Sequence, residues 1–485
     1  MRALALIGWT IASQILAICG LLLAGVEAAQ AHGTERGLVM LLPTGFAQVG
    51  GAIVVAVSFL IIAAVPVRWL QVMPRSAIPL WPLPANHRQC TSMASFAVLA
   101  ALILIGLTAT ADPLENLLPL TIWTIWWVGL TLLIAVTGDL WPWLNPWTGP
   151  LARLRRVTGT AVGRIPLLRL PTGIGYAPAI LLYGLFAWYE LVSLSPQDPA
   201  RLAMVVLAYW GLTLTAMILF GTGPWLQRGE PFSVFFRLIG TLAPLARRRH
   251  RRPAAGRNAA LVWPGARALT APALPLTGTL FVLLTLSSVS FDGFSYTFSW
   301  LGLIGINPLE FPGRSAVVTA NTAGLIAAFL LLGGLFFLAV FLGNRLAGLN
   351  GWPATREMAG RLVYSVIPIS IAFHICHYLP ILLVNGQYFS LALTDPFSLG
   401  WEPFGHHHHV TTSFMSNIDD VTYLWSAQTA LIVGGHVTGI LLAHMISLQR
   451  FGSSARAALS QVPLGFAMVL YTVFGLWLLS TPVAG

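Results

Sequence analysis

Charged residues are scarce in this sequence, and lysine is absent from it altogether. Only 8% of the 485 residues are charged and 56% are hydrophobic, which gives a mean hydropathy of +0.78. Soluble domains carry roughly 25% charged residues. The composition therefore excludes a water-soluble globular protein, and the sequence contains neither an internal repeat nor a segment typical of a soluble domain.

Cysteine is equally rare. Its three copies, Cys19, Cys90 and Cys376, form no CxxC pattern and lie far apart along the chain. Cys19 lies in an N-terminal apolar segment, Cys90 at a predicted cytoplasmic boundary and Cys376 inside a predicted span. No disulfide framework follows from this spacing.

Ten apolar stretches follow one another from about residue 43 to the C-terminus. Each approaches the roughly 20 apolar residues that cross a bilayer as a helix. The predicted spans are 43–66, 91–111, 118–138, 175–194, 202–221, 272–291, 316–343, 362–384, 422–447 and 459–480. The pattern predicts an all-α fold, a polytopic transmembrane helix bundle in which residues 32–485 form a single multipass membrane domain.

The loops between these spans alternate between arginine-rich and arginine-poor. Of the 26 arginines, 22 fall in the loops after the first, third, fifth, seventh and ninth spans, whereas only Arg36, Arg201 and Arg314 lie on the opposite side. Cytoplasmic loops carry an excess of basic residues. The alternation therefore predicts that residue 32 and the loop near 385–421 lie outside. The use of arginine alone, without lysine, is typical of a GC-rich bacterial genome, so the expected location is the bacterial inner membrane.

The net charge of +11 is explained by this orientation signal. The run RRRHRR at 247–252 lies in a basic cytoplasmic loop near 222–271 and has no interleaved aromatic residues, so it does not indicate a nucleic-acid partner.

The segment EPFSVFFRLIG of the same loop is predicted to lie flat on the membrane as an amphipathic helix. The tryptophans of TIWTIWW and LWPWLNPW are expected in an interfacial aromatic belt. The expected partner is the lipid bilayer, and a membrane-protein partner stays open.

Residues 1–31 have the pattern of a secretory signal. Arg2 precedes the apolar stretch Ala3–Leu23, and an A-x-A cleavage site ends at Ala31. The apolar part is longer than a typical signal core, so an uncleaved first span is the alternative. Cleavage after Ala31 would make His32 the first residue, and its amine and imidazole would suit Cu(II). His32 is otherwise an ordinary residue after a signal site.

Histidines inside the predicted spans are the main candidates for chemistry, because burying ionisable residues in lipid is unfavourable. His374 and His377 are three residues apart and share one helix face. In the next span His436 lies near the middle, beside a Gly-Gly pair that allows close helix approach, and His444 lies towards the cytoplasm. We expect His377 and His436 to face each other in the outer half of the bundle, although single span histidines are often packing residues.

Two carboxylates are predicted at a similar depth, Glu190 and Asp292 at the outer ends of the fourth and sixth spans. Three imidazoles and a carboxylate make a metal-binding set. The long outer loop adds four consecutive histidines, His406, His407, His408 and His409. These histidines would either bind metal or have no specific role. The long polar loop that carries them is a candidate lid or site.

Several segments resemble bacterial multipass membrane proteins known as fenitrothion hydrolases. The resemblance is carried by AHG at 31–33, GDLWPWLNPW at 138–147, AWYELV at 187–192, SFDGFS at 290–295, RLVYSVIPISIAFHICHYLPILLVNGQ at 361–387, GHVTGILLAH at 435–444 and FGLWLLSTP at 474–482. The family name implies hydrolysis of an aryl organophosphate ester. The polar positions that match are Asp292, His377, His436 and His444, whereas the four-histidine run departs from the family pattern.

Together these features predict a membrane-embedded, metal-dependent hydrolase whose site opens outwards. A divalent metal ion, copper or zinc, would be held by His377, His436 and a further His or acid, and would activate water for attack on a small apolar substrate. Asp292 or Glu190 would act as the base or orient the ligands. The alternatives are a copper transporter or assembly factor, which would use His32, His406–His409 and the span histidines, and haem ligation by paired span histidines.

Overall fold

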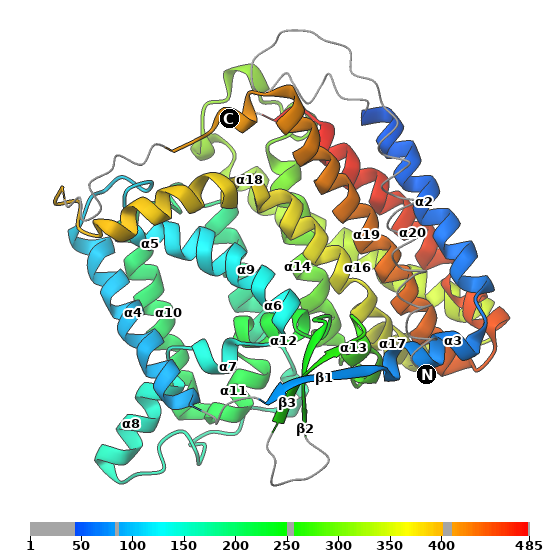
Figure 1. Ribbon diagram of the computed structural model, residues 1–485, viewed down its shortest axis with the longest axis horizontal. Coiled ribbons are helices and arrows are strands. Elements are labelled where there is room, and N and C mark those ends of the chain that lie inside the picture. Colours follow the sequence, from blue (N-terminus) through cyan, green and yellow to red (C-terminus); the bar gives the residue numbers. More distant parts are fainter. Residues whose placement is uncertain (1–43, 83–86, 250–256, 401–409, 484–485) are drawn as a thin grey trace. The chain divides into compact units, whose positions relative to one another are not determined.

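The computed structural model describes residues 44–82, 87–249, 257–400 and 410–483 (Figure 1). These residues form two compact units. Unit 1 comprises Met1–Ile78, Val262–His377 and Thr412–Gly485, and unit 2 comprises Pro79–Leu261 and Tyr378–Thr411, each within the described residues. The predicted signal (1–31), His32 and His406–His409 lie outside the described residues.

Nine helical segments of the described chain are long and apolar enough to cross a membrane, which confirms the predicted all-α polytopic bundle. They are α2 (Thr44–Ala64), α4 (Arg88–Thr108), α5 (Leu117–Pro119) with η3 (Leu120–Leu130) and α6 (Thr131–Thr137), α10 (Pro199–Phe220), α14 (Leu276–Ser295), α16 (Val318–Leu346), α17 (Trp352–Leu362) with η8 (Val363–Ser365) and α18 (Ile367–Thr394), α19 (Ile418–Phe451) and α20 (Ser454–Ser480). The remaining predicted span corresponds to α9 (Ala177–Leu191), whose 15 residues extend only about 22 Å.

Shorter elements connect the long helices. In unit 1 they are α3 (Val67–Val72), η2 (Met73–Arg75), α13 (Ala266–Thr270), α15 (Phe298–Leu303), η6 (Pro308–Glu310), η7 (Arg314–Ala316) and η9 (Ser413–Met415). In unit 2 they are α7 (Trp141–Leu144), α8 (Thr148–Thr158), η4 (Thr172–Ile174), α11 (Thr222–Arg228) and α12 (Pro231–Ile239). A small sheet has the strand order β1 (Ala77–Pro82), β3 (Arg257–Val262), β2 (Leu245–Arg249), with β2 and β3 antiparallel.

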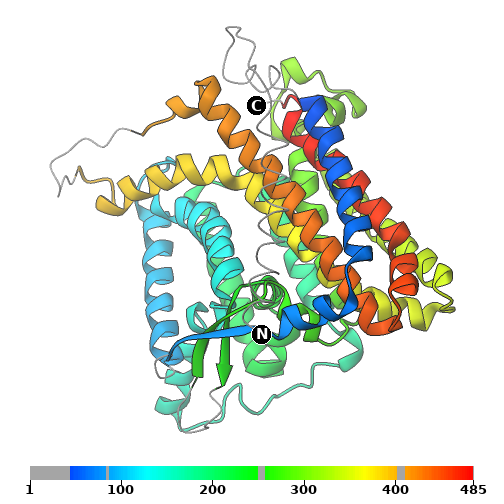
Figure 2. The same ribbon diagram turned by 45° about the vertical axis from the view of Figure 1, so that its right-hand side comes forward.

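In unit 1, helices α2, α19 and α20 lie side by side in both ribbon views (Figures 1 and 2). Gln48 Nε2 donates to Ser480 Oγ over 3.0 Å, and at the other end of the same helix pair Ser454 Oγ donates to the Ala63 carbonyl over 3.1 Å. Hydrogen bonds at both ends show that α2 and α20 run antiparallel along their whole length.

Glycine permits the close crossing of α18 and α19. A Cβ atom at Gly435 would lie 2.9 Å from the Pro368 carbonyl oxygen, and one at Gly439 would lie 2.7 Å from the Ser365 carbonyl oxygen. Backbones approach this closely only where small residues stand at the interface. The predicted close approach is confirmed at Gly435, whereas a Cβ at the adjacent Gly434 would meet nothing within 4 Å.

Unit 2 has an aromatic core built around η3, a π-helix of 11 residues. Its i→i+5 hydrogen bonds are rare in proteins and are found mostly as single turns. The segment places Trp126 4.5 Å from Phe232 and Trp127 4.8 Å from Phe186, measured between ring centroids. Trp127 is only 3% exposed. The expected interfacial belt is therefore wrong for this tryptophan, which packs in the interior, as do Trp141 and Trp147.

Helix α12 also differs from its prediction. Every residue of α12 except Arg237 is buried, so the segment does not lie flat on a membrane surface. Its three phenylalanines pack against the tryptophans of the aromatic core. The helix can be buried because the side chain of Glu230 caps its N-terminus from within the core. The sequence pattern does not reveal that this cap is buried.

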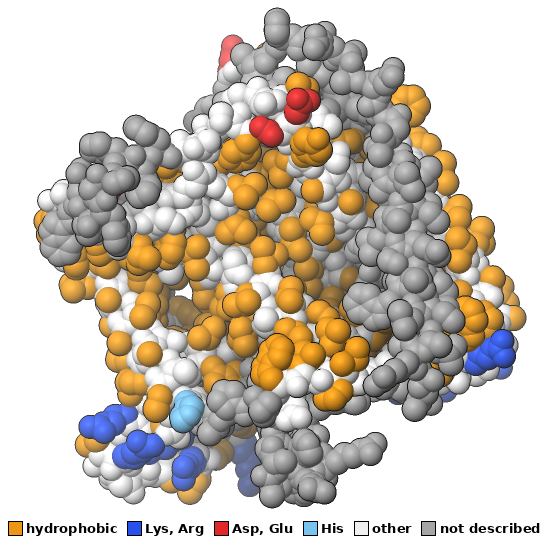
Figure 3. Space-filling model, viewed as in Figure 1, with side chains coloured by type: hydrophobic (Ala, Val, Ile, Leu, Met, Phe, Trp, Pro, Cys, Tyr) orange, Lys and Arg blue, Asp and Glu red, His pale blue; other side chains and the backbone are white. Residues whose placement is uncertain are grey.

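The long helices expose apolar side chains. Phe46 on α2 is 83% exposed and Leu331 on α16 is 76% exposed. Hydrophobic side chains cover much of the face shown in Figure 3, and basic side chains gather over α8 at one end of unit 2. Exposed apolar surface of this extent marks contact with another apolar phase. Together with the nine long apolar helices, it identifies a multipass protein in a lipid bilayer.

Candidate functional site

Helix α14 brings a polar sequence, SSVSFDGFS, into the interior of unit 1. Three buried serine hydroxyls donate to carbonyls of the preceding turn, for example Ser290 Oγ to Leu286 O over 2.8 Å. Because their hydrogen bonds are made within the helix, these serines are buried without an unsatisfied donor. The helix can therefore occupy the core and hold Asp292, which is 7% exposed, in its last turn.

Asp292 pairs with His377 of α18. The distance between His377 Nε2 and Asp292 Oδ2 is 2.7 Å, a length typical of a charge-assisted hydrogen bond. The His377 side chain is 31% exposed and that of Asp292 is 10% exposed. A carboxylate fixes the orientation of an imidazole and stabilises its protonated form. The pair is therefore suited to accepting a proton.

Gly293 lies beside the second nitrogen of this imidazole. A Cβ at Gly293 would stand 3.8 Å from His377 Nδ1 and 3.5 Å from Leu478 Cδ1, both ordinary contacts. An alanine would thus fit here and would add a methyl group next to Nδ1. Nε2 faces Asp292, and Nδ1 lies on the side of this glycine.

His436 lies in a second polar layer. Its ring contacts Phe373 and Tyr471, with centroids 6.3 Å and 6.2 Å away, and the Tyr471 hydroxyl hydrogen-bonds Ser290. His436 is completely buried, and its Nδ1 donates to the Ile432 carbonyl over 2.8 Å. Its Nε2 therefore carries the lone pair, and no hydrogen-bond partner for it lies within the described ranges.

The hydrogen bonds between α18 and α19 set the depth of His436. Cys376 Sγ donates to the Gln428 carbonyl over 3.1 Å, and Gln428 Nε2 donates to the Cys376 carbonyl over 2.7 Å. His436 follows Gln428 by eight residues, about 12 Å along the helix. His377 and His436 thus belong to different layers, and their joint ligation of one metal stays a prediction.

The other predicted residues have separate surroundings. His444 Nδ1 accepts from Gln461 Nε2 over 3.1 Å near the arginine-rich end of α19. His374 is buried, with only 4% of its surface exposed, and it interacts with at least one other group. Glu190 belongs to unit 2, where the Tyr378 hydroxyl donates to its Oε1 over 2.8 Å.

No group of three or more His, Cys, Asp and Glu side chains in the described chain could hold a metal ion. The pair of Asp292 and His377 supplies two such groups, and His436 supplies one. The histidines that could complete a set from the outside, His32 and His406–His409, are not among the described residues. The metal-ligand predictions are therefore neither confirmed nor contradicted.

Sequence reasoning missed Glu230, a fully buried carboxylate in unit 2. Its oxygens accept from the backbone N–H groups of Phe232 and Ser233, from Trp141 Nε1 and from the Tyr209 hydroxyl. An acidic residue followed directly by proline is a helix-start pattern, because proline is favoured at the first helical position. That pattern in GEPF could have located the cap, although not its burial.

Comparisons with protein-family models, curated proteins and solved structures found no match for this chain.

Proposed function

We propose that this protein is a membrane-embedded hydrolase that acts on small apolar esters at the outer end of unit 1. The observation that carries the proposal is the 2.7 Å contact between His377 Nε2 and Asp292 Oδ2. Ionisable residues inside membrane segments mark functional sites more often than structural ones. The resemblance to fenitrothion hydrolases supports the same reaction class.

The two side chains would have distinct roles. His377 Nδ1 would accept a proton from water as the water oxygen attacks the phosphorus or carbonyl carbon of the ester. Asp292 would hold the imidazole in place and stabilise its protonated form, as carboxylates do beside catalytic histidines. The imidazolium would then return the proton to the departing alkoxide or phenolate, which restores the neutral base.

Aromatic residues around the pair support an aryl substrate. Phe294 follows Gly293 on α14 and packs against Trp300 and Trp477, with centroids 5.6 Å and 6.1 Å away. Rings in edge and offset contact form favourable surfaces for a further ring. A neutral aryl ester dissolved in the bilayer could reach this end of the bundle through the lipid.

The test is hydrolysis of a p-nitrophenyl phosphate triester and a p-nitrophenyl carboxylic ester by the full-length protein in proteoliposomes. We expect His377→Gln to lower kcat/KM by about 100-fold or more, the usual contribution of a general base. Gly293→Ala should lower it as well, because the methyl group occupies the space beside Nδ1. His444→Gln, a histidine of the same unit at the opposite end, should change little.

Two results would contradict the proposal. One is the absence of hydrolysis by the wild-type protein with both ester classes. The other is full activity in His377→Gln at normal insertion.

A second function, transport or delivery of a metal ion such as copper or zinc, is favoured by one observation. His436 donates Nδ1–H to a backbone carbonyl and presents Nε2 as a lone pair, which is how metal-ligating histidines are oriented. Uptake of Cu(I) or Zn²⁺ into proteoliposomes, lost in His436→Gln but kept in His377→Gln, would support it. Hydrolysis without uptake would favour the first function.

A further inference from the structure

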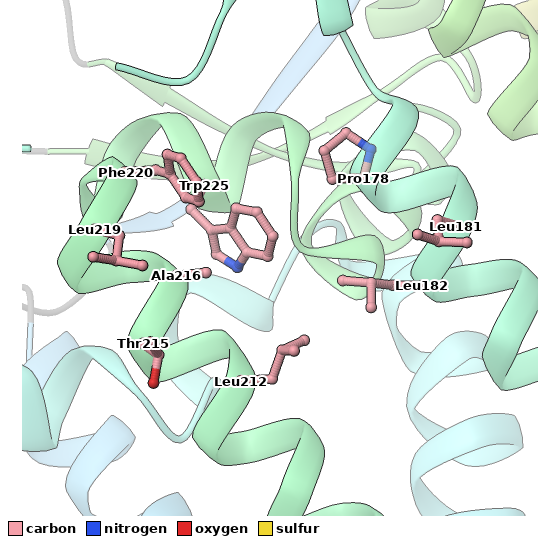
Figure 4. A pocket seen from close by; sticks show the side chains of 9 residues that line it. All are labelled: Pro178, Leu181, Leu182, Leu212, Thr215, Ala216, Leu219, Phe220 and Trp225. Carbon is pink, nitrogen blue, oxygen red and sulfur yellow. The ribbon is translucent and has the colours of Figure 1, made fainter. Parts of the chain in front are cut away.

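Helices α9, α10 and α11 of unit 2 enclose an apolar groove of about 490 Å³ (Figure 4). Leu182 of α9 faces Leu212 and Ala216 of α10 across the groove, and Phe220 lies at its end. Ligand pockets of proteins measure roughly 300–1,000 Å³. The groove lies at the arginine-rich end of α10, the end that the positive-inside rule places in the cytoplasm.

The indole N–H of Trp225 on α11 points into this apolar groove (Figure 4). Trp225 is only 6% exposed, and its Nε1 has no acceptor in the part of the chain that the structure describes. Buried tryptophan N–H groups usually have a hydrogen-bond partner. The groove therefore presents a donor that an acceptor of a bound molecule would satisfy.

The Trp225 ring is held in this orientation. It stacks on Phe220 with centroids 5.9 Å apart and planes 18° apart. The ring also lies against Gly229, where a Cβ atom would lie 2.3 Å from the ring atom Cε3. Any side chain at residue 229 would displace the indole, so the indole can occupy this position only because residue 229 is glycine. The donor is thus fixed before a ligand arrives.

The rim of the groove is basic. The backbone N–H of Leu168 donates to the Leu219 carbonyl over 2.8 Å, which places the exposed Arg169 beside the end of α10. Arg228 ends α11, three residues after Trp225. Residues 140–189 contain no Asp or Glu.

Arg155 of α8 belongs to the same basic region. Burial lowers the pKa of the Arg155 guanidinium, and the positive charge of Arg164 adds to that lowering. The Arg155 guanidinium donates to Thr222 Oγ1 at the start of α11 over 3.0 Å, so two like charges lie near this end of the groove and favour an anionic partner.

We propose that this groove binds an anionic, ester-linked phospholipid of the leaflet on the arginine-rich side. One acyl chain lies between α9 and α10, its ester carbonyl accepts the hydrogen bond from Trp225 Nε1, and its phosphate lies among the rim arginines. This lipid site belongs to unit 2 and is independent of the hydrolytic site proposed in unit 1.

The test is native mass spectrometry of the full-length protein in detergent, titrated with dioleoylphosphatidylglycerol and with its diether analogue. The diester should bind more tightly by roughly two- to tenfold, the equivalent of one net hydrogen bond. Trp225→Phe should abolish this ester preference, whereas Trp188→Phe, on the neighbouring helix α9, should keep it. Equal binding of the two lipids by the wild type, or an ester preference that survives in Trp225→Phe, would overturn the proposal.

Two further arms test the groove and the headgroup. Leu212→Trp, which fills the groove from an exposed position, should weaken both lipids by about tenfold, whereas Leu207→Trp, equally exposed on the same helix, should not. Arg169→Gln should reduce the preference for phosphatidylglycerol over phosphatidylcholine by roughly fivefold. Unchanged lipid binding in Leu212→Trp would contradict the lipid proposal. A protein that co-purifies with the wild type and is displaced by the tryptophan of Leu212→Trp would also contradict it, because the groove would then have another occupant.

Discussion

Among the described residues, each unit buries one carboxylate in an apolar interior, and the two carboxylates differ in their partners. Glu230 of unit 2 accepts four hydrogen bonds, all from groups that stay protonated at neutral pH. Asp292 of unit 1 contacts His377, whose imidazole can both donate and accept protons. A carboxylate surrounded by fixed donors holds a structure together, whereas one that shares its contact with an imidazole can take part in chemistry.

The largest effect on stability is expected from Glu230→Ala. The change would leave four buried donors without their acceptor, including the Phe232 and Ser233 backbone groups at the start of α12. Each such group destabilises by about 1–3 kcal/mol, so a total loss of roughly 4 kcal/mol or more is expected. The measurement is the thermal unfolding midpoint and the yield of monodisperse protein.

Glu230→Gln provides the matched control. The amide keeps one oxygen as an acceptor, so its destabilisation should be smaller than that of the alanine variant. If Glu230→Ala unfolds like the wild type, the carboxylate is not what holds α12 in the core of unit 2.

An intermediate effect is expected from Gly435→Ala. The new methyl group would lie 2.6 Å from Ala372 Cβ and 2.9 Å from the Pro368 carbonyl, so α18 and α19 must move apart. Overpacking of this kind destabilises by about 1–3 kcal/mol. Gly434→Ala, one residue earlier with open space around it, should be neutral or slightly stabilising. Equal midpoints of thermal unfolding for the two variants would show that the helices are not held at this close distance.

A small effect on stability is expected from Asp292→Asn, despite a large one on hydrolysis. Asparagine keeps an oxygen near His377 Nε2, so the free energy of unfolding should fall by about 1 kcal/mol or less. Without the negative charge the protonated imidazole is no longer stabilised, and kcat/KM should fall by about 100-fold. A stability loss as large as that of Glu230→Ala would erase the distinction between the two carboxylates.

No effect on folding is expected from alkylation of Cys90, which is exposed and lies near the start of α4. The arginine alternation predicts that this end of α4 is cytoplasmic. A membrane-impermeant maleimide should therefore label Cys90 only after spheroplasts are lysed, while Leu309→Cys, at an 81% exposed position of the opposite predicted side, should be labelled from outside. The reverse labelling pattern would contradict the predicted topology.

The fold class was predictable because membrane spans depend on the local density of apolar residues, which the sequence displays directly. The interior of unit 2 was not. Trp127 in the core and a tryptophan at a membrane interface have the same sequence context, and only tertiary packing distinguishes them. The burial of α12 depends on Glu230, whose hydrogen-bond partners come from two other segments of the chain.

The candidate site was predictable in its members but not in their pairing. Asp292, His377 and His436 were recognised from their residue types at membrane depth. The depth of each residue in the bundle depends on where the helices cross. The hydrogen bond between Gln428 and Cys376 places His436 in a different layer from His377, although their positions in the sequence suggested a similar depth. The partner of His377 in the structure is the carboxylate of Asp292 on α14, which lies 85 residues earlier in the sequence.

The antiparallel pair of α2 and α20 has a consequence for biosynthesis. The two helices are joined by a hydrogen bond between Gln48 and Ser480, residues separated by 432 positions. At about 5–20 residues per second, a ribosome needs on the order of 20–80 s to make the chain between them. During that interval α2 is already in the bilayer without its neighbour. A nascent chain that stalls before α20 would thus contain all of unit 2 but an incomplete unit 1, and membrane quality-control proteases would encounter it in that form.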